Sequence, residues 1–193
     1  ESDTHHIFVI DVSYSMAYKK GQKSALDSAK EAAIQQFDST RKLTEQDKVT
    51  IILMSSFPEV YLPASNKRQL VRNSLEQVKL SHYGSSSLTT FDLISDTVAK
   101  SRNALKKVML FTDFQRCGWE PGDTSQVKKL AERLKELSKR EDTRIGIFDV
   151  GVGSETDNRA VVDLRVDQKV VATRRTTTFA VDIQNWSTSS FPA

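Results

Sequence analysis

The sequence is poor in cysteine, in long apolar runs and in excess charge of either sign. Cys117 is the single cysteine among 193 residues, so the chain can form neither an internal disulfide bond nor a cysteine-based zinc cluster. It contains no run of about 18 apolar residues, which excludes a membrane-spanning helix within this sequence. The 28 basic and 25 acidic side chains leave a net charge of +3, so we expect no nucleic acid among its partners.

The residues that are present suffice for a folded core. Hydrophobic residues make up 38% and charged residues 27% of the chain, which is typical of a globular protein rather than a disordered one. At about 150 residues per domain, the length corresponds to one domain and a remainder. The chain opens at Glu1 without the basic and apolar regions of a signal peptide, so we expect any leader or anchor to lie outside this sequence.

Short apolar runs alternate with amphipathic segments over residues 7–150. Strands are predicted at 7–12, 49–54, 59–62, 108–111 and 145–150, and helices at 23–38, 70–78, 91–105 and 127–137. Near-continuous apolar strands separated by helices predict an α/β fold, a doubly wound, mostly parallel sheet with helices on both faces. The strand at 59–62 is flanked by Pro58 and Pro63, which favours an edge position.

The pattern changes after Gly151-Val152-Gly153. Strand-like runs follow at 161–166, 170–172 and 176–183, with no helical periodicity. Two or three strands are too few for a β-sandwich, which usually has about seven. We therefore predict one domain at 1–157 and a β-rich segment at 158–193. That segment is either an extension packed on the first domain or the start of a truncated β-sandwich.

Three polar clusters fall where ligands bind in open α/β sheets, at the carboxyl ends of strands. Asp11-Val12-Ser13-Tyr14-Ser15 follows the first strand, Gly84–Ser87 precedes the helix at 91–105, and Thr112-Asp113 ends the strand at 108–111. The crossover rules can bring these segments together although they are far apart in sequence.

The side chains in these clusters are oxygen donors suited to a hard cation. Asp11 and Asp113 supply negative charge, Ser13 and Ser15 supply neutral hydroxyls, and Ser85 can close one more position. Two carboxylates balance the charge of a divalent ion, and the hydroxyls add no further negative charge. The ion therefore remains electrophilic and can bind an oxygen atom of a partner. The alternative is that the two serines cap the next helix and that Asp11 is a turn residue.

The sequence resembles a known protein family over about residues 7–166. Ile7–Met16 resembles the opening of a von Willebrand factor type A domain, and Phe111-Thr112-Asp113 resembles that family's later acidic motif. Asp113–Arg116 followed by Trp119, and the segment Asn158–Val166, resemble bacterial BatA-like proteins of aerotolerance operons.

The resemblance implies a metal-ion-dependent adhesion site that binds Mg²⁺, with Mn²⁺ or Ca²⁺ as alternatives. In the family the two serines, here Ser13 and Ser15, contact the ion directly, and the aspartates, here Asp11 and Asp113, often act through water. The third loop of the family usually supplies a threonine. In this sequence Ser85 fits that role best, with Ser86 and Thr89 as alternatives, and Phe114 stands where the wider family commonly has glycine.

The resemblance further implies a non-enzymatic interaction module that binds an Asp or Glu of a protein partner. Tyr14, Arg116 and Trp119 would form the rim around the ion, since these residue types are frequent interface anchors, and the alternative for Trp119 is a role in packing. It also implies a membrane-anchored bacterial protein whose domain faces the periplasm, with anchoring segments outside this sequence.

Two rival interpretations remain open at this point. One is a metal-dependent nuclease or phosphotransfer enzyme in which Asp92 and Asp96 join Asp11 and Asp113 in an acidic cluster, because paired ions need several carboxylates. The other is a degenerate scaffold that binds no metal.

Overall fold

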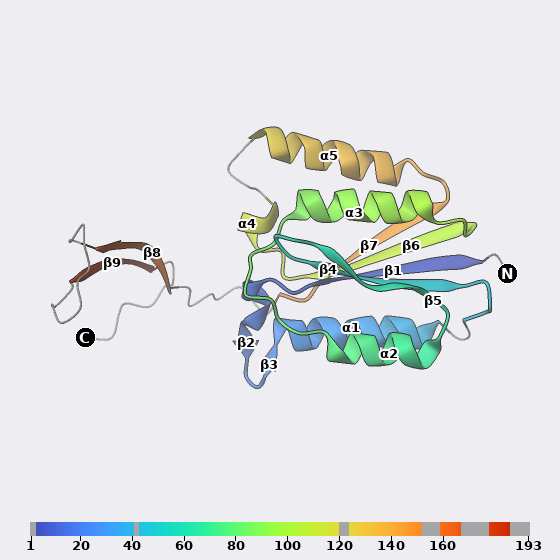
Figure 1. Cartoon of the computed structure of the whole chain (residues 1–193), viewed down its shortest axis with the longest axis horizontal. Coiled ribbons are helices and arrows are strands. Elements are labelled where there is room, and N and C mark those ends of the chain that lie inside the picture. The colour runs from blue at the N-terminus through green and yellow to red at the C-terminus, as the bar shows by residue number, and fades with distance from the viewer. Residues whose placement is uncertain (1–2, 41–42, 120–123, 152–158, 167–177, 186–193) are drawn as a thin grey trace. The chain divides into compact units, whose positions relative to one another are not determined.

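A computed structural model describes residues 3–40, 43–119, 124–151, 159–166 and 178–185. The chain divides into two compact units, Glu1–Val152 and Gly153–Ala193. In the larger unit a five-stranded sheet lies between two layers of helices (Figure 1).

The sheet has the strand order β5-β4-β1-β6-β7. The central strand β1 (Thr4–Asp11) pairs in parallel with β4 (Lys48–Met54) and β6 (Leu105–Thr112), and β7 (Thr143–Asp149) is parallel to β6. Only β5 (Glu59–Ser65) is antiparallel, and it forms one edge of the sheet. The predicted mostly parallel sheet is confirmed, with the strand between the prolines at its edge.

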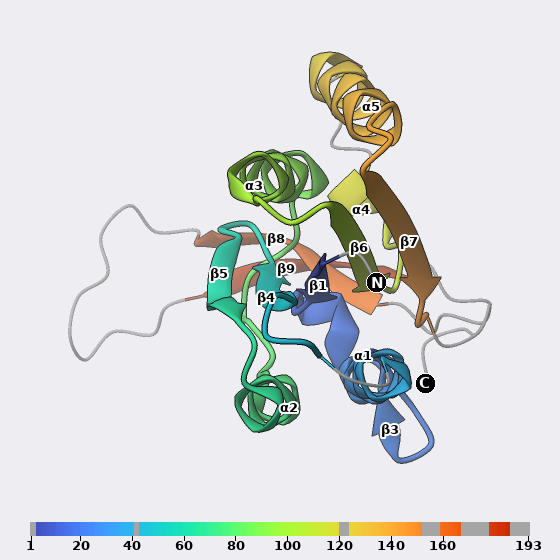
Figure 2. The same cartoon turned by 90° about the vertical axis from the view of Figure 1, so that its right-hand side faces the viewer.

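Helices cover both faces, as predicted (Figure 2). Helices α1 (Ala25–Ser39) and α2 (Arg68–Gln77) pack on one face, and α3 (Ser87–Lys100) and α5 (Thr124–Ser138) on the other. Alternate residues of β1 enter the two cores, because successive side chains of a strand point to opposite faces. No helix in the described part of the chain is long and apolar enough to cross a bilayer.

The boundary between α3 and β6 differs from the prediction. Leu105, predicted as the last apolar residue of the helix, is instead the first residue of β6, because α3 ends at Lys100 and Ser101 follows it as the C-cap. Four short elements have no predicted counterpart. They are η1 (Tyr14–Ala17), β2 (Lys19–Lys20), β3 (Lys23–Ser24) and α4 (Arg116–Trp119).

The smaller unit contains an antiparallel pair, β8 (Arg159–Val166) and β9 (Phe179–Asn185). Leu164 lies opposite Val181, and Val166 lies opposite Phe179, so these four exposed apolar side chains share one face. The other face carries charge, including ion pairs from Arg165 to Asp163 and Asp182. The strand predicted at 170–172 lies outside the described residues.

A capping box begins α1, the helix that follows the first polar cluster. The Ser24 hydroxyl accepts a hydrogen bond from the Asp27 N–H (3.1 Å), and the Asp27 carboxylate accepts one from the Ser24 N–H (3.0 Å). We expect Ser24→Ala to lower the free energy of unfolding by about 1 kcal/mol, measured by urea denaturation. Ser28→Ala, one turn later, serves as a control and should cost less, since that hydroxyl donates only to the helix backbone.

Candidate metal centre

Three loops meet at the carboxyl ends of β1, β4 and β6. The first carries Asp11–Ser15, the second is residues 81–86 before α3, and the third follows Thr112. Four backbone hydrogen bonds hold the second loop against the ends of β1 and β4: Ser81 N to Val12 O (2.7 Å), Tyr14 N to Tyr83 O (2.9 Å), Ser56 N to Gly84 O (2.8 Å) and Ser86 N to Ser55 O (3.3 Å). The predicted juxtaposition of polar loops is therefore present at the backbone level.

Asp11 is buried, with 1% of its surface exposed, and both of its carboxylate oxygens are engaged. Oδ1 accepts a hydrogen bond from the Ser13 N–H (2.9 Å), and Oδ2 accepts one from the Thr112 hydroxyl (2.7 Å). The second bond spans the parallel pair β1–β6, where Ile10 lies opposite Phe111. These contacts fix the orientation of the carboxylate at the end of the central strand.

The hydroxyls of Ser13 and Ser15 lie 3.1 Å apart. Ser13 occupies the N-cap position of η1 but makes no side-chain capping hydrogen bond, contrary to the capping alternative. The Ser15 hydroxyl donates to the carboxylate of Asp113. Two serines and the second aspartate thus form one hydrogen-bonded chain of oxygen atoms.

Asp113 lies half-buried directly after β6. Burial raises its pKa above the ordinary value, the hydrogen bond from Ser15 opposes that rise, and the negative charge of Asp11 adds to it. The next residue, Phe114, has φ = 51° and packs its ring against Trp119 with the centroids 5.1 Å apart. A glycine adopts this left-handed backbone freely, whereas another residue there costs roughly 1–2 kcal/mol. The departure from the family pattern therefore strains the backbone beside Asp113.

Ser85 faces the third loop across Gly118. A Cβ atom at position 118 would lie only 2.1 Å from the Ser85 hydroxyl oxygen, so only glycine allows this close approach. The Ser87 hydroxyl donates to the carbonyl of Gly118 (2.7 Å) and joins the same two loops from the start of α3. Ser85 thus projects from the second loop toward the segment that follows Asp113.

The two alternatives for the third-loop ligand occupy different positions. Ser86 is the N-cap of α3, and its carbonyl accepts the hydroxyl of Thr89 (3.3 Å). Thr89 is exposed on the helix itself. Ser85, in contrast, lies against Gly118 of α4, the short helix that follows the late aspartate.

Sequence reasoning assigned no role to Thr112, Ser87 or Gly118. Thr112 is fully buried and orients Asp11. Its position was the available signal, because it is a polar residue at the end of an apolar run and directly before an acid. Gly118 carried no such signal, because its close approach to Ser85 depends on the tertiary packing of two distant loops.

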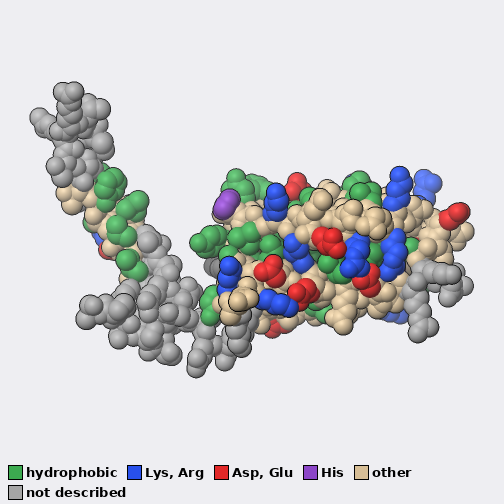
Figure 3. Space-filling view, turned by 90° about the horizontal axis from the view of Figure 1, so that it is seen from below, with side chains coloured by type: hydrophobic (Ala, Val, Ile, Leu, Met, Phe, Trp, Pro, Cys, Tyr) green, Lys and Arg blue, Asp and Glu red, His purple; other side chains and the backbone are tan. Residues whose placement is uncertain are grey.

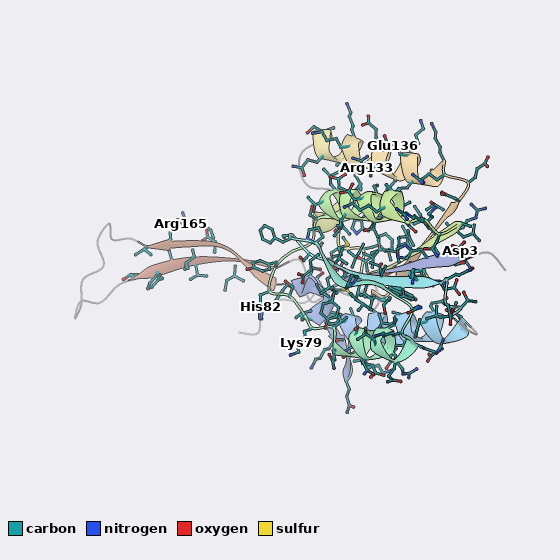
Figure 4. The ribbon with its side chains drawn as sticks, turned by 45° about the vertical axis from the view of Figure 1, so that its right-hand side comes forward. Asp3, Lys79, His82, Arg133, Glu136 and Arg165 are labelled. Carbon is teal, nitrogen blue, oxygen red and sulfur yellow. The ribbon has the colours of Figure 1, made fainter. Side chains whose placement is uncertain are left out.

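The acidic cluster required by the enzyme alternative is not assembled. Asp92 on α3 pairs with Arg133 of α5 at 2.8 Å, and Arg133 also contacts Glu136 (Figure 4). Asp96 lines a separate pocket together with His5. Within the described ranges no group of three or more His, Cys, Asp or Glu side chains is placed to hold a metal. A site here must therefore use hydroxyl oxygens.

The predicted rim is present in part. Tyr14 is 67% exposed beside the serines. Trp119 is half-buried and packs edge-on against Phe91 of α3 with ring centroids 6.0 Å apart, so it contributes to the core. The side chain of Arg116 lies outside the described residues.

An open α/β sheet with polar loops at the carboxyl ends of its strands defines a class of domains that bind ligands at that edge. The family model of the von Willebrand factor type A domain matches residues 6–115, more than half of the chain. The chain therefore belongs to the von Willebrand factor type A family, as predicted, and such domains typically mediate protein–protein interactions.

Solved structures agree on the fold. BatB from Bacteroides thetaiotaomicron has a TM-score of 0.56 at 17% identity over 94% of this chain and 80% of that one. An aerotolerance-related membrane protein from Bacteroides fragilis has a TM-score of 0.56 at 18% sequence identity, over 93% of this chain and 81% of that one. A von Willebrand factor type A protein from Catenulispora acidiphila gives 0.58 at 16% over 76% of this chain and 33% of that one. No curated protein sequence matches.

Proposed function

We propose that the larger unit binds a protein partner through a divalent cation, Mg²⁺ in the first place, held at the carboxyl end of the sheet. The observation that carries this proposal is that the carboxylates of Asp11 and Asp113 lie at the carboxyl ends of the neighbouring strands β1 and β6, beside the hydroxyls of Ser13 and Ser15, which are 3.1 Å apart. Asp11 does act as a turn residue, since its carboxylate accepts the N–H of Ser13, but the Ser13 hydroxyl caps nothing and lies against Ser15 instead.

The donor set fits the proposed ion. Mg²⁺ prefers oxygen ligands in octahedral geometry and retains water, which suits two hydroxyls with two carboxylates behind them. Ser13 and Ser15 would hold the ion directly, Asp11 and Asp113 would anchor the shell, and Ser85 would supply the third loop. When bound, the ion supplies an electrophilic position that a partner Asp or Glu completes. Mn²⁺ and Ca²⁺ have the same ligand preference and remain alternatives.

Calorimetric and thermal-shift titration of the protein with Mg²⁺ tests the site. We expect the ion to raise the melting temperature, because a ligand at 100 times its Kd stabilises the folded state by about 2.7 kcal/mol. Ser13→Ala and Asp113→Asn should each weaken binding by roughly 10-fold or more, since each removes an oxygen donor or a charge. Asp92→Asn should leave it unchanged, because Asp92 is paired with Arg133.

The opposite outcomes favour the rival functions. Neither heat nor a thermal shift with Mg²⁺, Mn²⁺ or Ca²⁺ would support the metal-free scaffold. Phosphodiester hydrolysis with Mn²⁺ that Asp92→Asn abolishes would support the enzyme. Peptides that bind equally well in excess chelator would contradict the role of the ion in partner binding.

We further infer that the complete protein is membrane-anchored, with this domain on the periplasmic side of a bacterial envelope. The support is the fold likeness to an aerotolerance-related membrane protein. The smaller unit fits the start of a β-sandwich, because a two-stranded sheet with one apolar face needs a second layer to be stable.

A further inference from the structure

We propose that the partner segment carries, within a few residues of its metal-binding Asp or Glu, an aromatic or large aliphatic side chain that binds in a groove beside the ion. This inference rests on the proposed function and specifies the kind of partner. The groove has a volume of about 710 Å³, within the usual range for ligand pockets. It lies between β5 and residues 77–83, which are the end of α2 and the first part of the segment that leads to α3, and its floor is Val12 and Leu53.

The groove adjoins the loop that carries the proposed metal ligands. Val12, on its floor, is the residue between Asp11 and Ser13. Tyr83, on its wall, accepts the backbone N–H of Tyr14 through its carbonyl at 2.9 Å. An extended segment that places a carboxylate at the ion therefore passes over the groove within a few residues, since each residue spans roughly 3.3 Å.

Exposed aromatic rings line the groove. Phe57 is 72% exposed and Tyr83 is 59% exposed, and the two rings pack edge to face with centroids 5.5 Å apart. Tyr61 of β5 and the half-buried Leu80 extend this apolar wall. Hydrophobic side chains gather, beside a histidine, at the end of the larger unit that lies left in Figure 3. Such a concentration of rings is typical of binding hot spots, where desolvated aromatic contacts supply most of the affinity.

The groove lining carries two charged side chains, Lys79 and Glu59. Lys79 on the groove wall is exposed and has no carboxylate partner among the described residues. Figure 4 shows Lys79 and His82 at the same end of the larger unit. Glu59 is the one acid in the groove lining and offsets the charge of Lys79. The apolar walls, rather than the charges, therefore select the side chain that binds there.

Selection from a displayed peptide library tests this pairing. Two libraries of random peptides, one with a fixed central Asp and one with a fixed Asn, are selected on the protein in Mg²⁺ and, separately, in excess chelator. We expect Asp peptides to be enriched over Asn peptides in Mg²⁺ only, with Phe, Tyr, Trp or Leu over-represented at one position within about four residues of the Asp. Individual enriched peptides should lose at least roughly 10-fold in affinity when that residue becomes Ala.

Substitutions in the groove distinguish its contribution to peptide binding from that of the ion. Phe57→Ser and Tyr83→Ser should remove the aromatic preference while the Asp requirement in Mg²⁺ persists, because neither side chain is among the proposed ligands. Leu70→Ala, an exposed apolar side chain of α2 outside the groove lining, should change neither. An Asp requirement without an apolar preference, or a preference that survives both serine variants, would overturn this inference alone.

Two further outcomes have distinct meanings. Equal enrichment of Asp and Asn peptides in Mg²⁺ would overturn the proposed function together with the pairing inferred from it. Concentration-dependent self-association in sedimentation that Phe57→Ser abolishes would assign the groove to a second copy of this chain and would overturn an acidic partner segment as its occupant.

Discussion

Asp11→Asn is expected to fold normally and to lose affinity for Mg²⁺ by roughly 100-fold. The amide oxygen can still accept the Ser13 N–H, and the amide nitrogen can donate to the Thr112 hydroxyl, which rotates to accept. The geometry at the end of β1 therefore survives the change. What is lost is one of the two negative charges that balance the cation, in a site with no third carboxylate to replace it. Calorimetry with Mg²⁺ and urea denaturation without it measure the two effects separately.

Asp47→Asn provides the matched control. Asp47 is also a buried aspartate, but it precedes β4, at the opposite end of the sheet from Asp11. Its carboxylate accepts the backbone N–H groups of Thr4 (2.8 Å) and Thr44 (2.7 Å) and the Thr44 hydroxyl (2.9 Å). An amide must direct its N–H₂ at one of these N–H donors, which costs about 1–3 kcal/mol of stability. We expect this variant to be destabilised with unchanged Mg²⁺ affinity. Equal Mg²⁺ affinity in wild type and Asp11→Asn would refute the site.

The sheet could be predicted from the sequence because its strands are buried on both faces. A strand covered on both sides must be apolar at nearly every position, and residues 7–12 and 49–54 follow that rule. The helices followed from their periodic apolar faces. Leu105 was assigned to the wrong element because an apolar residue after a helix fits either a last turn or a first strand position. The short elements η1 and α4 contain too few residues for any periodicity.

The candidate site was predictable only where chain position determines spatial position. Asp11 and Asp113 end neighbouring parallel strands, so the topology alone brings the two ends of β1 and β6 together. The contribution of Ser85 depends on how residues 81–86 lie across the strand ends, and on a glycine 33 positions later in the sequence. No local pattern encodes that contact. The groove likewise depends on Phe57 and Tyr83 meeting from two loops, which the spacing of the residues does not reveal.

Acidification from about pH 7 to pH 4 is expected to lower the free energy of unfolding of the larger unit by about 3 kcal/mol through His5. His5 is 4% exposed, and its ring nitrogens contact the hydroxyls of Ser101 (2.9 Å) and Thr50 (2.8 Å). Burial, together with the smaller effect of the positive charges of His6, Lys106 and Lys48, lowers its pKa from 6.5 to about 4. The unfolded chain therefore binds a proton below about pH 6.5 while the folded unit does not. The stability that the folded unit has because His5 is buried in its neutral form is present in full above pH 6.5 and is lost as the pH falls through about 4.

Other titrating groups modify this dependence without reversing it. The pKa of His6 is also lowered, by burial and by Lys107, so it adds to the loss. The raised pKa of Asp113 acts in the opposite direction, because the folded unit then takes up a proton more readily than the unfolded chain. The lowered pKa of Asp47 costs stability only below about pH 4. Histidines therefore dominate the interval between pH 6.5 and 4.

Urea denaturation of wild type and His5→Gln at several pH values isolates the histidine. The glutamine can still bond to both hydroxyls and does not titrate, so more than half of the wild-type decrease between about pH 6.5 and 4 should disappear. His82→Gln replaces an exposed histidine and should follow the wild-type curve. A His5→Gln curve parallel to wild type would show that the ring takes up its proton without cost. The burial of His5 at the start of the central strand β1 would then play no part in the acid sensitivity of the fold, and the remaining slope would have to come from carboxylates.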